Sequence, residues 1–254
     1  KLEKRDLSEK DKEILLGMGI IPEKHTPTPV AAQYYRIVLL VLESVHRDFM
    51  HYYNRNIPAE ATPFLDELLT KYPHLDHYYS SAIPTTEGLN SAFRSQVIFD
   101  RDTPEVGKQG SIFGQLNETD WRGIFLNASS GYYANEFKQY PRQFGMQEYY
   151  AREYLEEQGY TGASGWGFHN DVMYKETIKM LERGRNDKML MFTKTLDMHQ
   201  PYPYYGLKWE EMPESVRDNK FVTVRGIYWV DHTLQEFFKE AEANGLMDDR
   251  TLFI

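Results

Sequence analysis

The sequence contains no cysteine among its 254 residues. Disulfide bridges, thiolate metal sites and a cysteine nucleophile are therefore excluded. Basic residues are also in deficit, because 29 Lys and Arg stand against 38 Asp and Glu, which gives a formal net charge of −9. Binding to nucleic acid depends on an excess of positive charge, so this balance argues against a nucleic-acid partner.

Long apolar runs are absent as well. The longest one, Ile37–Leu42, is far shorter than the roughly 20 residues that a helix needs to cross a bilayer. The sequence starts on a charged residue in a polar stretch and shows no signal peptide, which leaves targeting segments upstream of Lys1 open. The chain does hold 41% hydrophobic residues, enough for a sizeable core.

Strand-like and helix-like segments alternate along the chain. Buried strands are expected at 36–42, 122–126, 189–196 and 250–254, with a short strand at 77–80. Helices are expected from Thr62-Pro63, from Thr85, over 171–181 and over 228–243. This alternation predicts an α/β fold, in which a mixed, mostly parallel sheet lies between helices.

The chain is expected to hold one α/β domain and an appended arm. Residues 1–35 combine a short apolar stripe with three prolines, a composition typical of an arm and an extended linker. Residues 36–254 form the expected domain. Its last strand, 250–254, reaches the end of the sequence, and a buried strand needs partners, so we expect the domain to be incomplete at its carboxyl end.

Polar residues follow two of the expected strands. Glu43 lies in the segment VLES, and Asp197 and His199 lie in TLDMHQPY. Because ligands of open α/β sheets bind outside the carboxyl ends of the strands, we expect these side chains to point into one crevice. Glu43 would be an oxygen ligand for a divalent cation, unless it only caps the next helix. His199 would contact a substrate oxyanion or protonate a leaving group, unless its neighbours satisfy it.

Two threonines stand where a helix is expected to begin, in the segment IPTTEGLN. A hydroxyl at a helix N-terminus lies beside unpaired backbone N–H groups and the positive end of the helix dipole, and this placement favours a neighbouring anion. A metal would lower the pKa of the hydroxyl and make it a nucleophile for phosphoryl or sulfuryl transfer. The alternative is that Thr85 or Thr86 is a plain N-cap.

Taken together, these segments resemble the sulfatase-like branch of the alkaline phosphatase superfamily, and within it the lipoteichoic acid synthase and phosphoglycerol transferase group. The resemblance runs from residue 36 to the end, and eight segments follow the order of the family. They are RIVLLVLESVHRDF (36–49), TPFLDELL (62–69), YSSAIPTTEGL (79–89), FGMQEYY (144–150), WGFHNDVMY (166–174), MFTKTLDMHQPY (191–202), YWVDHTLQEFF (228–238) and DDRTLFI (248–254).

The resemblance implies a metal-dependent enzyme. It implies that Glu43 is a metal ligand, that Thr85 is both ligand and nucleophile, and that His199 contacts the substrate; Thr86 stays open as the nucleophile. It also implies an Asp-His metal pair directly after a strand like TLFI, so the metal site in this sequence is expected to be incomplete. One divalent metal is expected, and oxygen ligands with a histidine favour Mn2+, with Mg2+ or Zn2+ open.

The nucleophile separates two branches of the superfamily. Formylglycine sulfatases need Cys or Ser in a C/S-x-P/A-x-R pattern, which neither Ser80 nor Ser81 starts. A threonine with a single Glu resembles the phosphotransferases instead. This implies transfer of a phosphoglycerol- or phosphoethanolamine-type headgroup, from a lipid donor to a cell-envelope acceptor, through a phospho-threonine intermediate. A sulfatase- or phosphodiesterase-type hydrolase and an inactive sulfatase-like binding module are the alternatives.

The expected substrate contacts depart from the lipoteichoic acid synthases. The His and Trp-x-Arg residues that grip glycerol phosphate in that group correspond here to Asn127, Ala134 and Glu136. Arg142 is a candidate for the missing cation, with a solvated surface charge as the alternative. The resemblance further implies a phospholipid headgroup or envelope glycan as substrate. It places the domain on the extracytoplasmic face of a bacterial membrane, tethered through segments outside this sequence.

Overall fold

The computed structural model describes residues 8–10, 13, 34–95, 110–202 and 209–254. The chain divides into two units, Lys1–Gln33 and Tyr34–Ile254. In the first unit only residues 8–10 and 13 are described, partly as helix. Every element discussed below belongs to the second unit.

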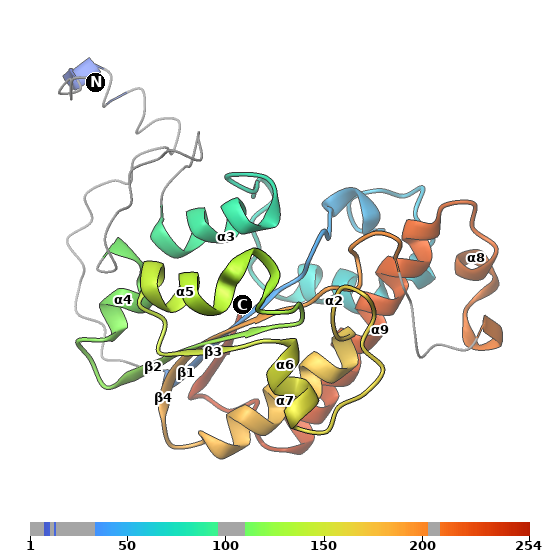
Figure 1. Ribbon diagram of the computed structural model, residues 1–254. Helices are drawn as coiled ribbons and strands as arrows, with labels where there is room; N and C mark the ends of the chain where they lie inside the picture. Colours follow the sequence, from blue (N-terminus) through green and yellow to red (C-terminus); the bar gives the residue numbers. More distant parts are fainter. Residues whose placement is uncertain (1–7, 11–12, 14–33, 96–109, 203–208) are drawn as a thin grey trace. The chain divides into compact units, whose positions relative to one another are not determined.

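Five strands of this unit form one sheet in the order β3-β2-β4-β1-β5 (Figure 1). They are β1 (Arg36–Val41), β2 (Trp121–Asn127), β3 (Glu148–Tyr150), β4 (Lys188–Lys194) and β5 (Thr251–Phe253). All four pairings between them are parallel. The predicted fold class is confirmed, as are the strands expected at 36–42, 122–126, 189–196 and 250–254. The strand β3 was not predicted, because its three residues, EYY, form no apolar run.

Helices connect the strands. They are α2 (Pro63–Lys71), α3 (Thr85–Arg94), α4 (Ile112–Leu116), α5 (Glu136–Phe144), α6 (Arg152–Glu157), α7 (Asn170–Arg183), α8 (Glu214–Arg217) and α9 (Val222–Ala243), with 3-10 turns at Arg47–Phe49, Ala59–Ala61, Tyr133–Asn135 and Trp209–Glu211. The four expected helices are confirmed as α2, α3, α7 and α9, although α9 begins at Val222 rather than at Tyr228. No described helix is both long and apolar enough to cross a membrane.

The strand expected at 77–80 is wrong. This segment is irregular and solvent-exposed, and Tyr78 and Tyr79 keep 74% and 72% of their surface accessible. A strand needs a neighbour to pair its backbone N–H and C=O groups. The described sheet does not include this segment, and its tyrosines therefore belong to an exposed loop.

Successive residues of each strand face opposite helix layers. On β4, Met189 and Met191 belong to the core beneath α7 and α9, whereas Leu190 and Phe192 belong to the core beneath α3, α4 and α5. Figure 1 shows these two sets of helices on opposite sides of the sheet. Both faces are therefore buried, as expected for a parallel sheet.

An aromatic cluster fixes α3 on the sheet. Phe93 of α3 is 1% exposed. Its ring contacts those of Phe113, Phe125, Phe144 and Phe192 edge-on, with centroids 5.1, 5.6, 5.2 and 5.1 Å away. Such edge-to-face pairs add to the burial of apolar area. The cluster thereby holds α3, and with it Thr85 at the start of the helix, against β2 and β4.

Candidate functional site

Glu43 and Thr85 meet at the carboxyl end of β1. The Thr85 hydroxyl donates a hydrogen bond of 2.8 Å to Glu43 Oε1. Glu43 follows β1 by two residues and is 6% exposed, whereas Thr85 is the exposed first residue of α3. The structure thus brings together the two residues that the sequence analysis proposed for one site. Among the described contacts, none joins Thr86 to Glu43.

Local structure holds this pair in place. The Glu43 backbone N–H donates to Thr195 Oγ1 at 3.1 Å, and the Ser44 hydroxyl donates to Glu43 Oε1 at 3.0 Å. On the other side, a Cβ at Gly88 would lie 3.2 Å from both Ala82 O and Ser80 Oγ. Glycine therefore lets the preceding loop lie close against the first turn of α3.

A buried lysine shares this edge of the sheet. Lys194 is the last residue of β4, and its Nζ lies 3.5 Å from Glu43 Oε2 and 3.4 Å from Ser129 Oγ. The side chains of Lys194 and Glu43 are only 8% and 5% exposed. Lys194 is not among the residues predicted from the sequence. A signal was present, because lysine is rarely buried without a partner and here it ends a buried run, MLMFTK.

Glu136, at the start of α5, is also buried near this edge. It accepts hydrogen bonds from the Tyr149 hydroxyl at 2.6 Å, the Asn127 amide at 2.9 Å and the Tyr140 hydroxyl at 3.1 Å. Burial raises the pKa of Glu136, while its hydroxyl donors and the charge of Lys194 oppose this rise. At a position where the lipoteichoic acid synthases are expected to carry a cation, this chain therefore holds a carboxylate that its own fold satisfies.

His199 lies in the loop after β4 and is partly exposed. Its Nδ1 lies 2.9 Å from the Gln200 carbonyl oxygen, and its ring packs against Trp166 with centroids 4.5 Å apart. Trp166 is 47% exposed, so the two rings form an accessible platform. No contact in the described part of the chain joins His199 to Glu43 or Thr85, and its role in binding substrate stays a prediction.

Arg142 lies elsewhere on the same layer of helices. It is exposed and occupies the last turn of α5, whereas Glu136 occupies the first. Six helical residues span about 9 Å along the axis. The described contacts do not bring Arg142 to Glu43, Thr85 or His199, and its proposed role stays a prediction.

The expectation that Asp197 points into the crevice is wrong. Asp197 is 1% exposed and accepts hydrogen bonds from His169 Nδ1 at 2.7 Å, from the Asn170 N–H at 2.8 Å and from Trp229 Nε1. The physical reason is that its carboxylate caps α7 at Asn170 and joins it to α9 through Trp229. These partners come from distant segments, which the local sequence around Asp197 does not reveal.

The described residues supply part of a metal site. No group of three or more His, Asp or Glu side chains within them is arranged to hold a metal ion. Glu43 and Thr85 nevertheless bring two oxygen atoms within 2.8 Å of each other. Oxygen donors suit Mg2+ and Mn2+, so the pair fits the start of a ligand set without completing it.

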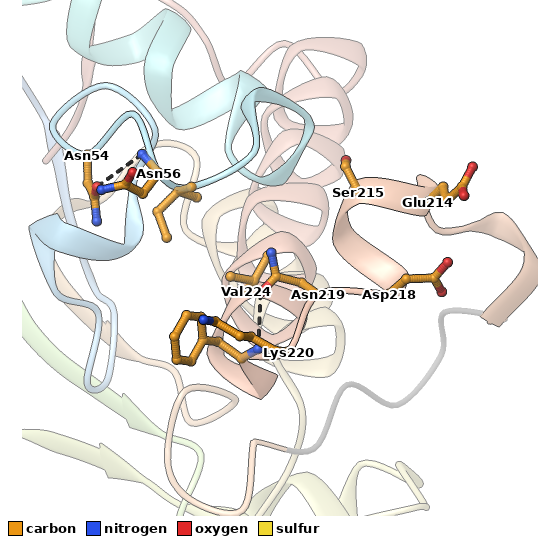
Figure 2. A pocket seen from close by; sticks show the side chains of 10 residues that line it. Asn54, Asn56, Glu214, Ser215, Asp218, Asn219, Lys220 and Val224 are labelled. Carbon is orange, nitrogen blue, oxygen red and sulfur yellow. Dashed lines mark hydrogen bonds between the residues drawn. The ribbon is translucent and has the colours of Figure 1, made fainter.

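A separate hollow of about 850 Å³ lies between the loop at residues 54–57 and the start of α9 (Figure 2). It is lined by Asn54, Asn56, Ile57, Glu214, Ser215, Asp218, Asn219, Lys220, Phe221 and Val224. Backbone N–H groups of Asn56 and Phe221 donate to the side chains of Asn54 and Asn219, at 3.1 and 3.0 Å. None of the predicted site residues lines this hollow.

Comparison with solved structures places the fold among known proteins. A protein in the alkaline phosphatase superfamily from Vibrio parahaemolyticus is 18% identical with a TM-score of 0.69, covering 88% of this chain and 54% of that one. The lipoteichoic acid synthase LtaP from Listeria monocytogenes is 17% identical with a TM-score of 0.72, covering 95% and 60%. The C-terminal periplasmic domain of EcEptC from Escherichia coli, in complex with Zn, is 20% identical with a TM-score of 0.54, covering 83% and 60%.

The chain therefore spans 54 to 60% of the length of these solved chains. At such low identities the likeness shows the fold alone. A comparison with curated proteins gave no match. The family model named Sulfatase matches residues 36–254, which confirms the family inferred from the sequence. The chain belongs to the sulfatase family.

Proposed function

We propose that residues 36–254 belong to the catalytic domain of a metal-dependent phosphotransferase, with residues 1–35 as an appended arm. The hydrogen bond from the exposed Thr85 hydroxyl to the buried Glu43 carboxylate carries this proposal. It joins a threonine hydroxyl, which can act as a nucleophile, to a carboxylate, which can bind a divalent cation. The pair lies at the carboxyl end of a parallel sheet, where ligands of such sheets bind, and at the N-terminus of a helix, which favours an anion.

Glu43 and Thr85 would hold the metal, which when bound lowers the pKa of the hydroxyl and stabilises negative charge on the phosphoryl group. Mn2+ is the favoured ion, with Mg2+ and Zn2+ as alternatives; the zinc complex of the EcEptC domain supports a divalent metal in this fold. Glu43 Oε1 already accepts a hydrogen bond from Thr85 and so orients its hydroxyl.

The transfer has two steps. Thr85 Oγ1 releases its proton to solvent and forms a bond to phosphorus while the bond from phosphorus to the donor alcohol breaks, and that alcohol leaves with a proton. His199 is the candidate that supplies this proton. The oxygen of a second alcohol then bonds to phosphorus and gives its proton to His199, while the bond to Thr85 Oγ1 breaks and Thr85 takes up a proton from solvent. With water as the acceptor, the same site would act as a hydrolase.

The substrate we propose is a phosphoglycerol- or phosphoethanolamine-type lipid headgroup, transferred to an acceptor in a bacterial cell envelope. The lipoteichoic acid synthase and the periplasmic domain among the similar structures support this class and an extracytoplasmic location. Asn127, Ala134 and Glu136 still distinguish this chain from the glycerol phosphate site expected in that group. They leave the headgroup open between the two types.

The test uses the full-length protein and phosphodiester headgroup analogues, with Mn2+ and with EDTA. We expect turnover with Mn2+, loss of turnover with EDTA, and loss in the double variant Thr85→Ala, Thr86→Ala. A double variant as active as the wild-type protein would refute the proposal. Adding an alcohol acceptor and measuring transfer against release of the free headgroup phosphate separates the transferase from the hydrolase.

A further inference from the structure

Lys194 occupies the centre of the carboxyl edge of the sheet. The register aligns it with Val41 of β1 on one side and with Asn127 of β2 on the other. Leu190 and Phe192, which precede it at alternate positions, face α3, α4 and α5. Lys194 continues this row, so it lies on the face where α3 begins at Thr85 and α5 begins at Glu136.

The ammonium group of Lys194 is held loosely for a buried charge. An ammonium has three N–H donors. Among the described residues, its ion-pair and hydrogen-bond partners are Glu43 Oε2, 3.5 Å away, and Ser129 Oγ, 3.4 Å away. Both distances are longer than the roughly 2.7–2.9 Å of a strong charge-assisted hydrogen bond. Glu43 Oε1 is meanwhile occupied by two hydroxyl donors, from Ser44 and Thr85.

A buried lysine that only neutralised Glu43 would gain from a closer contact, because the desolvation of both charges is offset only by good geometry. A divalent cation at Glu43 would also repel the ammonium from the carboxylate. Glu43, Lys194 and a divalent cation together carry two net positive charges, which a phosphate dianion would balance. The flexible stem of lysine lets the ammonium follow such an anion.

We infer that Lys194 is an anion-binding residue of this site, whose ammonium turns from Glu43 to a non-bridging oxygen of a bound phosphoryl group. The inference takes its substrate class from the proposed function, but its test needs only phosphate binding and no turnover. The cationic side chain that binds the substrate is then Lys194, at the centre of the sheet on β4, instead of Arg142 on the surface of α5.

The experiment measures the affinity of the full-length protein for inorganic phosphate by titration calorimetry, with and without Mn2+. We expect Lys194→Met to weaken phosphate binding at least about tenfold, because a hydrogen bond to a charged group contributes about that factor or more. Lys194→Arg should retain most of the affinity. Lys188→Met is the matched control, since Lys188 begins the same strand and pairs with Asp120 at 2.7 Å.

Phosphate affinity that Lys194→Met leaves unchanged would overturn the inference, and so would an equal loss in Lys188→Met. Mn2+ content is measured in parallel. Retained Mn2+ with weakened phosphate binding supports an anion contact, whereas a variant that loses Mn2+ and binds phosphate like the wild-type protein without metal refutes it. If thermal melts show that Lys194→Met does not fold, Lys194→Gln carries the same test with a polar end group.

The proposed phosphotransferase function and the anion-binding role of Lys194 can be refuted independently. Phosphate binding does not need the nucleophile, so activity that survives in the Thr85→Ala, Thr86→Ala double variant would refute the proposed function while the calorimetry still decides on Lys194. Conversely, full phosphate affinity in Lys194→Met, with turnover that depends on Thr85, would leave the proposed function intact and remove Lys194 from the site.

Discussion

Asp231, in the middle of α9, caps the start of α2. Its Oδ1 accepts a hydrogen bond of 2.7 Å from the Leu65 N–H, and its Oδ2 accepts one of 3.2 Å from the Phe64 N–H. Thr62 occupies the N-cap position of α2, but its side chain makes no capping hydrogen bond. A carboxylate 166 positions away from Leu65 therefore caps this helix in place of the local side chain.

Burial raises the pKa of Asp231 to about 6, although the two backbone N–H donors oppose the rise. Because this folded-state pKa lies above the unfolded value, the folded state binds the proton more tightly. Raising the pH from about 4 to 6 should thus reduce the free energy of unfolding by about 2 kcal/mol from this group. Urea denaturation of wild-type protein and Asp231→Asn measures this effect: their difference in free energy of unfolding should fall by that amount across the range, and a constant difference would contradict the assignment.

The choice between Thr85 and Thr86 as nucleophile is open to a direct test. Thr85→Ala should lower turnover by at least about a hundredfold, because covalent catalysis is lost with the hydroxyl. Thr86→Ala is the matched control and should retain activity, since no described contact joins Thr86 to Glu43. Mass spectrometry of quenched reactions should find phosphate on Thr85, and phosphate on Thr86 instead would reverse the assignment.

Glu43→Gln should reduce the bound metal measured by elemental analysis after dialysis. The substitution keeps an oxygen near Thr85 but removes the charge that attracts a divalent cation. It also leaves Lys194 buried beside a neutral group, so we expect a loss of folding stability of about 1–3 kcal/mol. Glu60→Gln, at an exposed position in a 3-10 turn, is the control. Equal metal content in wild-type protein and Glu43→Gln would count against Glu43 as a ligand.

Phe93→Ala should destabilise the protein by about 3–5 kcal/mol, because it leaves a cavity among four other aromatic rings. Phe93→Leu fills more of that space and should cost less. Urea denaturation measures both effects. If the cluster positions Thr85, turnover of the folded Phe93→Leu variant should also fall, whereas a variant with wild-type turnover would separate the cluster from the site.

Structural features that depend on neighbouring residues could be predicted from the sequence, whereas contacts that depend on distant partners could not. Four strands and four helices follow from local apolar patterns, and family order led to the pairing of Glu43 with Thr85. The strand β3 was missed because its three residues form no apolar run of their own. Lys194 ends a buried run, but it was missed because its place beside Glu43 depends on the register of β1 and β4, and Asp197 was misplaced because Asn170 and Trp229, far along the chain, determine its role.

The position of β4 has a consequence for amide hydrogen exchange. It pairs with β2 along all seven of its residues and with β1 along six, and both of its faces are buried. Its amides should therefore be among the last to exchange, opening only in large unfolding events. Lys194 is anchored to this slow segment, whereas Thr85 follows directly on the exposed loop that contains Tyr78 and Tyr79. The two sides of the site should thus differ in how often they open, with Thr85, the proposed nucleophile, on the faster side.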